Sequence, residues 1–225
     1  MKRFQKAAVL LLGSIVLLLA ASALVQPSNQ REWLTDQAVL PTAVFNGPLV
    51  TLRNVRNFRY DSAGAPIPDY DDRTYDLNRI ETVWFVLAPF ELDRRGPAHT
   101  FLSFGFADSQ FVAISVEARR EKDETYSLLK GLLKRFELMY VIGDERDLIQ
   151  LRTNHRGDEV YVYPIRTTPD KVRRLFVEML ERANGLQQHP EFYNTITNNC
   201  TTNILDHANR VATNKIRWGR EVLLP

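Results

Sequence analysis

The sequence predicts an α+β fold in which a mostly antiparallel sheet packs against helices. Residues 99–106 and 110–117 are apolar, β-rich segments separated by a short polar turn, which is the pattern of a β-hairpin. Residues 169–185 carry apolar side chains at helical spacing. The segment that begins at Cys200 has a polar start and further apolar residues at i+4 and i+8, which indicates another helix. Helices before and after part of an antiparallel sheet are typical of this class.

The N-terminus has the layout of an export signal. Basic residues at positions 2, 3 and 6 precede the apolar segment 7–25. The length of this segment, close to the roughly 20 residues that span a bilayer, favours an uncleaved single-pass anchor. The alternative is a signal peptide that is cleaved after Ala23, at an A-x-A site. In both cases we expect the rest of the chain on the periplasmic side of the bacterial inner membrane.

The composition of the chain excludes several classes of protein. The 225 residues have a formal net charge of +2 and the basic residues are spread out, so nothing indicates a nucleic-acid partner. About 200 residues follow the N-terminal segment, which is enough for one domain with a substantial core. The single cysteine excludes an internal disulfide and leaves a free thiol in an oxidising compartment.

The chain divides into four parts. These are an N-terminal segment (1–25), an extended arm (26–48), a single domain (49–213) and a tail (214–225). Apolar residues are scattered through the arm, so we expect little regular structure there. The domain opens with alternating residues 50–60, an expected strand, and continues with a loop over 61–79. Residues 82–87 are apolar on both sides and are expected to form a central strand.

The second half of the domain predicts two helices and a further strand before the cysteine. Leucines at helical spacing predict a helix over 126–138, which the polar residues 143–147 interrupt. Residues 160–163 have the pattern of a strand. Thr168 has the position of an N-cap ahead of the next helix, and Gly185 is expected to close that helix.

Cys200 is the candidate nucleophile. It follows an Asn- and Thr-rich stretch and begins a predicted helix. There the unpaired backbone N–H groups and the helix dipole favour a thiolate over a thiol. The alternative is that Cys200 is a small buried apolar residue without a chemical role, as most lone cysteines are.

Among the four histidines, His99 is the candidate general base. It opens an apolar strand next to a loop, so its ring is held at a strand end. The alternative is a histidine that caps a backbone carbonyl. His155 is predicted in a polar turn, His189 in a loop, and His207 lies two helical turns after Cys200. No pair of histidines has metal-ligand spacing, and we predict neither a metal nor a cofactor.

A cysteine–histidine pair commonly has a third polar residue that orients the imidazole ring. Ser115 and Glu117 lie two positions apart in the second strand of the hairpin, so they share one face of it. We expect this face to look towards His99, and both residues are candidates for the third catalytic position. The alternative for Glu117 is a surface ion pair with Arg119 or Arg120.

Several segments of the chain together resemble one protein family. They are His99–Phe104, Ala113–Arg119, Phe136–Asp147, Pro190–Thr195 and Asn198–Asn203. In this order they resemble the bacterial envelope family described as the Lnb N-terminal periplasmic domain, over roughly residues 30–215. More distantly, a histidine on a strand followed by Asn-Cys at a helix start is similar to permuted NlpC/P60 and lecithin–retinol acyltransferase-like proteins. This second likeness implies a permuted papain-like order.

The resemblance implies a chemical role for the candidate residues. Cys200 matches the nucleophile position and His99 the position of the base. The family is named after an enzyme that moves an acyl chain from the glyceryl group of a lipoprotein to its terminal amine. The resemblance therefore implies a cysteine-dependent acyltransferase that works through a thioester, with a lipid-linked or lipoprotein substrate at the inner-membrane surface. Tyr193 and Asn199, within the matching segments, are then candidate substrate-binding residues.

Two other functions are compatible with the same residues. An amidase or peptidase acting on cell-wall peptides would use the same pair, and a non-enzymatic envelope scaffold would keep only the fold. An apolar groove beside Cys200 favours acyl transfer, whereas an open polar cleft favours peptide hydrolysis. A thiol buried far from His99 favours the scaffold.

The polar segment 144–147 also matches the family, without a known role. For this segment we expect either a buried network of Glu145 and Arg146 or a structural loop.

Overall fold

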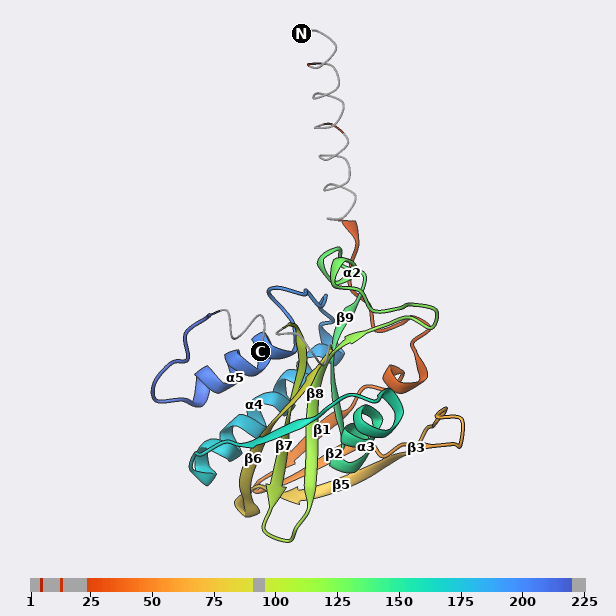
Figure 1. Cartoon of the computed structure of the whole chain (residues 1–225). Helices are drawn as coiled ribbons and strands as arrows, with labels where there is room; N and C mark the ends of the chain where they lie inside the picture. The colour runs from red at the N-terminus through yellow and green to blue at the C-terminus, as the bar shows by residue number, and fades with distance from the viewer. Residues whose placement is uncertain (1–4, 6–12, 14–23, 91–95, 220–225) are drawn as a thin grey trace.

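The computed structural model describes residues 24–90 and 96–219, together with residues 5 and 13. Within these ranges, eight strands form one mostly antiparallel sheet with helices packed on it, so the predicted α+β class is confirmed (Figure 1). The strand order is β1-β2-β9-β8-β7-β6-β10, and β5 pairs with β2 beside this path. The contact between β2 and β9 is parallel, which makes the sheet a mixed one.

The elements have the following bounds. The strands of the sheet are β1 (Thr42–Asn46), β2 (Leu49–Arg56), β5 (Tyr70–Asp76), β6 (Ile80–Pro89), β7 (Ala98–Phe106), β8 (Phe111–Arg119), β9 (Glu137–Asp144) and β10 (Tyr161–Pro164). A separate pair is formed by β3 (Arg59–Tyr60) and β4 (Pro66–Ile67). The helices are α2 (Leu128–Leu132), α3 (Glu145–Gln150), α4 (Pro169–Gln188) and α5 (Cys200–Val211), with the 3-10 turns η1 (Thr35–Gln37) and η2 (Leu77–Arg79) and the π-helical turn η3 (Leu151–Arg156).

The sequence predicts the hairpin of β7 and β8, and the structure places it in the middle of the sheet. Its register pairs Phe101 with Ser115 and Leu102 with Ile114. Nearly all residues of both strands are buried, so the hairpin is covered on both faces.

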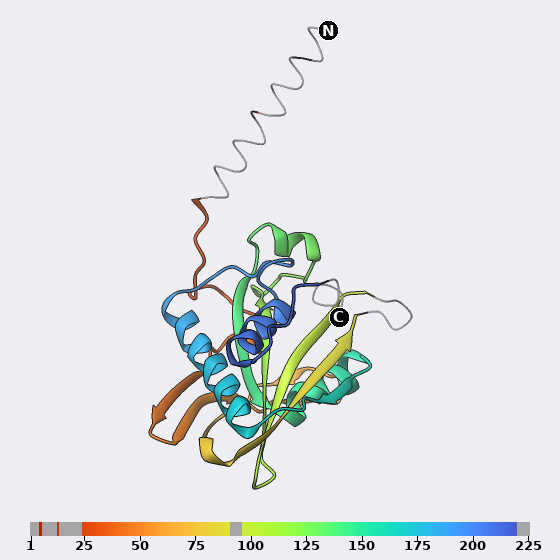
Figure 2. The same cartoon turned by 90° about the vertical axis from the view of Figure 1, so that its left-hand side faces the viewer.

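Helices cover the two faces of the sheet in different ways. On one face, Leu102 and Ile114 belong to a large core that includes Phe176 of α4 and Ile204 of α5. Figure 2 shows these two helices lying across the sheet. On the other face, Phe101 belongs to a smaller core that α3 and its neighbours cover. The hairpin therefore positions side chains towards both helical layers.

The predicted helix over 126–138 is wrong in its second half. Helix α2 ends at Leu132, and the central strand β9 begins at Glu137. Residues 137–143 are all buried, because β9 lies between β2 and β8 and is covered on both faces. A continuous apolar stretch of this kind has no period of its own, so the sequence pattern does not separate a buried strand from a helix.

Four smaller expectations also need correction. The loop expected over 61–79 contains strand β4 and strand β5, and β5 pairs with β2. The arm contains β1, which pairs with β2, so it is more regular than expected. Residues 82–87 lie in β6, which pairs with β7 and the short β10 and therefore sits next to the edge of the sheet. Gly185 lies inside α4, which continues to Gln188 because Leu186 still packs in the core.

The predicted membrane segment 7–25 falls almost entirely outside the described residues. Among the helices of the described chain, none has the length and apolar character needed to span a bilayer.

Candidate cysteine–histidine site

Cys200 is the first residue of α5, as the sequence predicts. Asn199 is the N-cap: its side chain accepts a 2.9 Å hydrogen bond from the backbone N–H of Thr202. The Thr202 hydroxyl in turn accepts a 2.9 Å hydrogen bond from the backbone N–H of Asn199, which completes a capping box. This pair of bonds fixes the first turn of the helix and with it the Cys200 thiol, which is 8% exposed.

His99 is the second residue of β7, and its ring lies in the same cavity wall as the Cys200 thiol, where the two groups shift each other's pKa. The structure therefore brings together two residues that are about one hundred positions apart in the chain. Helix α5 packs on β7 and β8, so its N-terminus meets the strand end that carries His99. The buried imidazole, 5% exposed, has its Nε2 directed at the neighbouring strand.

Ser115 and Glu117 meet His99 from β8. Nε2 of His99 lies 2.7 Å from Oγ of Ser115 and 3.1 Å from Oε1 of Glu117. The Ser115 hydroxyl donates its proton to the same Glu117 oxygen at 2.7 Å, so its oxygen accepts from the imidazole. In neutral His99 the proton is then on Nε2, and Nδ1 is left to receive the proton of the thiol. The expected surface ion pair of Glu117 with Arg119 or Arg120 is wrong.

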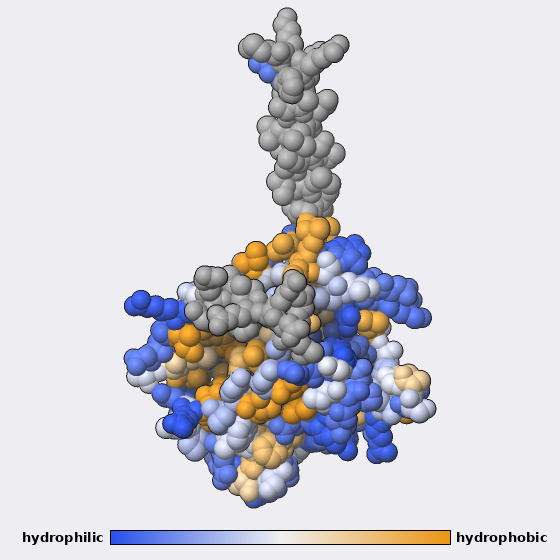
Figure 3. All heavy atoms as spheres, in the orientation of Figure 1, coloured by the Kyte–Doolittle hydropathy of each residue, from blue (hydrophilic) through white to orange (hydrophobic). Residues whose placement is uncertain are grey.

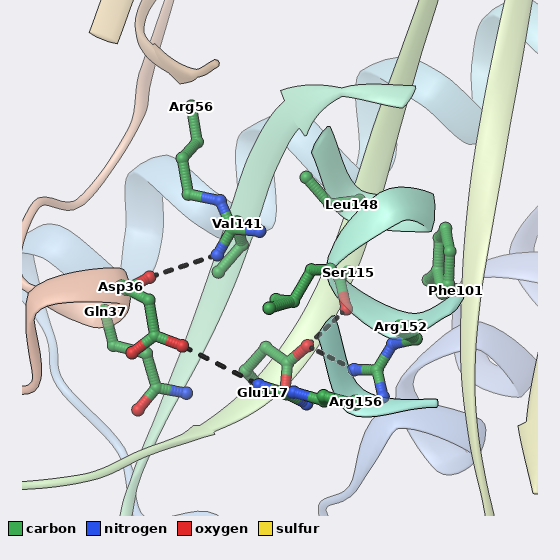
Figure 4. Close-up of a pocket in the computed structure, with 11 residues that line it drawn as sticks. Asp36, Gln37, Arg56, Phe101, Ser115, Glu117, Val141, Leu148, Arg152 and Arg156 are labelled. Atoms are coloured by element: carbon green, nitrogen blue, oxygen red, sulfur yellow. Dashed lines mark hydrogen bonds and ion pairs between the residues drawn. The ribbon is translucent and has the colours of Figure 1, made fainter. Parts of the chain in front are cut away.

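Arg152 completes the site, and the sequence analysis did not identify it. This arginine is 5% exposed and lies in η3, where its Nη2 is 3.3 Å from Oε1 of Glu117. Figure 4 shows Glu117 between Ser115 and Arg152. Nη1 of Arg152 lies 3.7 Å from Oδ2 of Asp158, so the carboxylates of Glu117 and Asp158 together compensate the charge of the buried guanidinium.

Burial and charge shift the acidities of these groups. Burial raises the pKa of the Cys200 thiol, but the hydrogen bond and positive charge of His99, together with hydrogen bonds from Thr100, lower it overall to about 7. Burial and the charge of Arg152 lower the pKa of His99, yet Glu117 and the thiol raise it above its ordinary value. Burial disfavours the Glu117 carboxylate, but His99 and Arg152 hold its pKa well below the usual range. The site thus favours thiolate, imidazolium and carboxylate together.

A cavity of about 160 Å³ leads to the thiol. Its walls include both candidate substrate-binding residues, Tyr193 and Asn199. The Tyr193 hydroxyl is 3.4 Å from that of Tyr126, and the amide nitrogen of Asn199 donates to the carbonyl of Thr195 at 2.7 Å. Both side chains shape the cavity, and their role in substrate binding stays a prediction.

The other histidines lie apart from Cys200. His207 hydrogen-bonds to Tyr140 at 2.8 Å beneath α5, and its burial lowers its pKa to about 4. His155 stacks on Tyr60, and His189 follows the end of α4. Within the described part of the chain, no group of histidine, cysteine and acidic residues has the arrangement of a metal site.

The polar segment 144–147 has a structural role that differs from the expected one. Asp144 caps α3, and Arg146 hydrogen-bonds to Asn57 at the surface. Asp147 is the buried member, 1% exposed, and its carboxylate accepts hydrogen bonds from Arg56 at 2.9 and 3.3 Å. The expected buried network of Glu145 and Arg146 is therefore replaced by a pair that ties α3 to β2.

The fold and the site define a class of α+β protein that holds a cysteine thiol against a histidine and an acidic group. The chain belongs to the family of the Lnb N-terminal periplasmic domain, whose model matches residues 67–222. This match contains all of the site residues described above and confirms the predicted resemblance. It also identifies the domain as periplasmic. A search of curated proteins and a search of solved structures each gave no significant match.

Proposed function

We propose that this protein is a membrane-associated acyltransferase that carries an acyl chain as a thioester on Cys200. One observation carries the proposal: Cys200 begins α5 at the wall of a cavity that it shares with His99, whose ring is held from β8 by Ser115 at 2.7 Å and by Glu117 at 3.1 Å. This environment lowers the pKa of the thiol. A thiolate is the nucleophilic form of cysteine, and a lowered pKa beside a histidine is typical of catalytic cysteines.

The first half of the proposed reaction forms the thioester. His99 takes the thiol proton on Nδ1, and the sulfur of Cys200 attacks the carbonyl carbon of an acyl ester. The negative oxygen of the tetrahedral intermediate is stabilised by the backbone N–H of Cys200, which lies in the first helical turn and lacks an intrahelical acceptor. The carbon–oxygen bond then breaks, and His99 returns its proton to the leaving alkoxide. A thioester and a free alcohol result.

The second half releases the acyl chain. An amine enters, and its nitrogen attacks the thioester carbonyl while His99 accepts the proton that this nitrogen loses. The carbon–sulfur bond breaks and the thiol recovers its proton, which leaves an amide as product. Throughout the cycle Glu117 and Ser115 hold the ring by Nε2 and stabilise its protonated form.

An apolar groove beside α5 favours an acyl chain as the transferred group. The groove has a volume of about 620 Å³, within the range of small-molecule sites. Ile204, Ala208 and Val211 of α5 line it, together with Phe85 of β6. Thr201 lines both this groove and the Cys200 cavity. Such a surface suits a hydrocarbon chain better than a cell-wall peptide.

The rival functions have less support. A scaffold without chemistry has no need for a thiol whose pKa is lowered by a histidine. A peptidase or amidase uses the same first step, and the groove argues against it. We also propose the permuted papain-like relationship, which rests on the chain order of a strand histidine before a cysteine at a helix start.

Mass spectrometry of the full chain after incubation with bacterial inner membranes tests the proposal. We expect a fatty-acyl adduct on Cys200 that neutral hydroxylamine removes, as it does thioesters. Cys200→Ser tests the need for the thiol, and His189→Gln, at an exposed position outside the site, is the matched control.

The possible results separate the three functions. An adduct in the wild type and in His189→Gln, with none in Cys200→Ser, supports acyl transfer. Cleavage of cell-wall peptides without any acyl adduct would establish the hydrolase instead. If the folded protein forms no acyl adduct and cleaves no cell-wall peptide, the non-enzymatic scaffold is the remaining function.

A further inference from the structure

We propose that the surface around α2 is the part of the domain that contacts the lipid bilayer. This surface, the leucine patch, consists of Phe90, Leu128, Leu129, Leu132, Leu133 and Ile196. Its side chains are between 40% and 64% exposed. An exposed cluster of large apolar side chains on a soluble surface marks an interaction site. The proposal goes beyond the proposed reaction and does not depend on it.

Helix α2 turns its apolar side away from the core. The three leucines of α2 and the C-cap residue Leu133 are exposed, whereas Gly131 is the buried residue of the helix. A Cβ atom at position 131 would lie 2.2 Å from Oγ1 of Thr195, so the helix can approach the loop before α5 only through a glycine. Thr195 also donates a 2.8 Å hydrogen bond to the carbonyl of Leu128. These contacts fix the orientation in which the leucines stay exposed.

The leucine patch borders the Cys200 cavity. Phe90 and Leu128 belong to the patch and also line the cavity. Ile196 is the neighbour of Thr195, which is bonded to α2, and the ring of Phe90 lies 6.2 Å from that of Tyr126 in another cavity wall. The apolar residues therefore surround one side of the entrance to the thiol.

The position of the N-terminal segment favours a bilayer as the partner that contacts the leucine patch. The continuous described chain begins at residue 24, and its first segment, coloured red-orange, lies at the same end of the molecule as α2 (Figures 1 and 2). Hydrophobic residues also gather at this end in Figure 3. The arm runs beside the segment that leads into α2, where the backbone N–H of Lys122 donates a 2.8 Å hydrogen bond to the backbone carbonyl of Glu32. The apolar sequence 7–25 thus joins the domain next to the leucine patch.

The charges around the leucines fit a lipid surface. Residues 126–135 contain Lys130, Lys134 and Arg135 and no acidic residue, and Arg135 forms a 3.0 Å ion pair with Glu124 just before them. Leucines interspersed with basic residues are typical of helices that lie in the interface of a membrane with anionic lipids. Apolar side chains would enter the head-group region while the basic ones contact phosphate. An ester group of a lipid at that depth would then lie at the cavity entrance.

Site-specific crosslinking in vesicles tests the proposal. The full chain is reconstituted into vesicles of phosphatidylethanolamine and phosphatidylglycerol, with a photoreactive benzophenone amino acid in place of Leu129. The matched control carries the same group in place of Ile67 of β4, which is 52% exposed and distant from the patch. We expect lipid adducts several times more abundant at position 129 than at position 67.

Two results would overturn the proposal. One is equal labelling of lipid from both positions, and the other is a crosslink from position 129 to a second copy of the chain instead of to lipid. Circular dichroism of each labelled variant, compared with the wild type, verifies that the domain is folded. A further variant combines the crosslinking group at position 129 with Leu132→Glu and Leu133→Glu. In this variant the yield of lipid adduct at position 129 should fall to the yield at position 67.

Discussion

Nε2 of His99 and Oγ of Ser115 lie 2.7 Å apart across the β7–β8 hairpin, and this distance determines which ring nitrogen faces the thiol. The Ser115 hydroxyl donates its hydrogen bond to Glu117, so towards the imidazole its oxygen acts as an acceptor. The ring is thereby held with Nδ1 free for Cys200. The hairpin register, which pairs Phe101 with Ser115, produces this arrangement without any contribution from a loop.

The reactivity of the thiol should follow the lowered pKa of Cys200. Alkylation of the single cysteine by iodoacetamide should rise with pH to a midpoint near 7, because the thiolate is the reacting form. Below this midpoint the sulfur is protonated and slow, and above it the rate levels off. His99→Gln should move the midpoint up towards the ordinary value of 9.0 and slow alkylation at pH 7 about tenfold or more.

The alkylation experiment has a direct control. His189→Gln alters an exposed histidine after α4 and should leave the midpoint unchanged. A midpoint near 9 in the wild type would contradict the proposed thiolate–imidazolium pair.

Glu117 should matter more than Ser115 for thioester formation. Glu117→Gln removes the charge that stabilises protonated His99, and we expect a loss of about 100-fold in the rate of acyl adduct formation. Ser115→Ala leaves the 3.1 Å contact between His99 and Glu117 and should cost about tenfold. Single-turnover mass spectrometry measures both rates. A larger loss in Ser115→Ala than in Glu117→Gln would assign the orientation of the ring to the serine.

Arg152 should restrain the basicity of His99. Its charge lowers the pKa of the imidazole, so Arg152→Met should raise the pKa of His99, and the ring should stay protonated to higher pH. The ¹H NMR titration of the ring, assigned by comparison with His99→Gln, measures this shift. Arg152→Lys keeps a positive charge and should leave the titration closer to that of the wild type. A lower pKa of His99 in Arg152→Met would mean that loss of the ion pair releases Glu117 from the ring.

The sequence predicts those parts of the site that local patterns encode. The capping residue Asn199 and its polar neighbours indicate where α5 begins. Ser115 and Glu117 share one face because side chains alternate along a strand. Arg152 could not be predicted in this way. It reaches Glu117 from a π-helical turn 35 positions later, and no spacing in the chain relates the two. Its place depends on the packing of α3 against the sheet.

The same distinction explains the strand that the sequence analysis missed. Strand β9 pairs with β8 over residues 112–119, and a buried strand owes its conformation to such neighbours more than to its own pattern. The leucines ahead of it have helical spacing, but they are exposed instead of forming a core stripe. Spacing alone does not distinguish an apolar face that meets the core from one that meets another surface.

Asp147 should stabilise the fold without taking part in the reaction. Its carboxylate accepts hydrogen bonds from Arg56, from the backbone N–H of Phe58 and from the hydroxyl of Tyr60, all within 3.3 Å. Asp147→Ala would leave the buried Arg56 guanidinium without its partner, and loss of one member of a buried pair costs about 3–5 kcal/mol in the free energy of unfolding. Asp147→Asn still accepts some of these bonds and should cost less.

Urea denaturation measures this effect on the free energy of unfolding, with Asp108→Ala as the matched control. Asp108 forms a 3.5 Å ion pair with Arg79 at the surface, where such pairs contribute about 0–1 kcal/mol. Under native conditions, the alkylation midpoint of Cys200 should be the same in Asp147→Asn as in the wild type, because Asp147 touches neither His99 nor Glu117. A shifted midpoint in Asp147→Asn would show that the buried pair is coupled to the site. A loss of stability in Asp147→Ala as small as that in Asp108→Ala would show that the pair is dispensable for the fold.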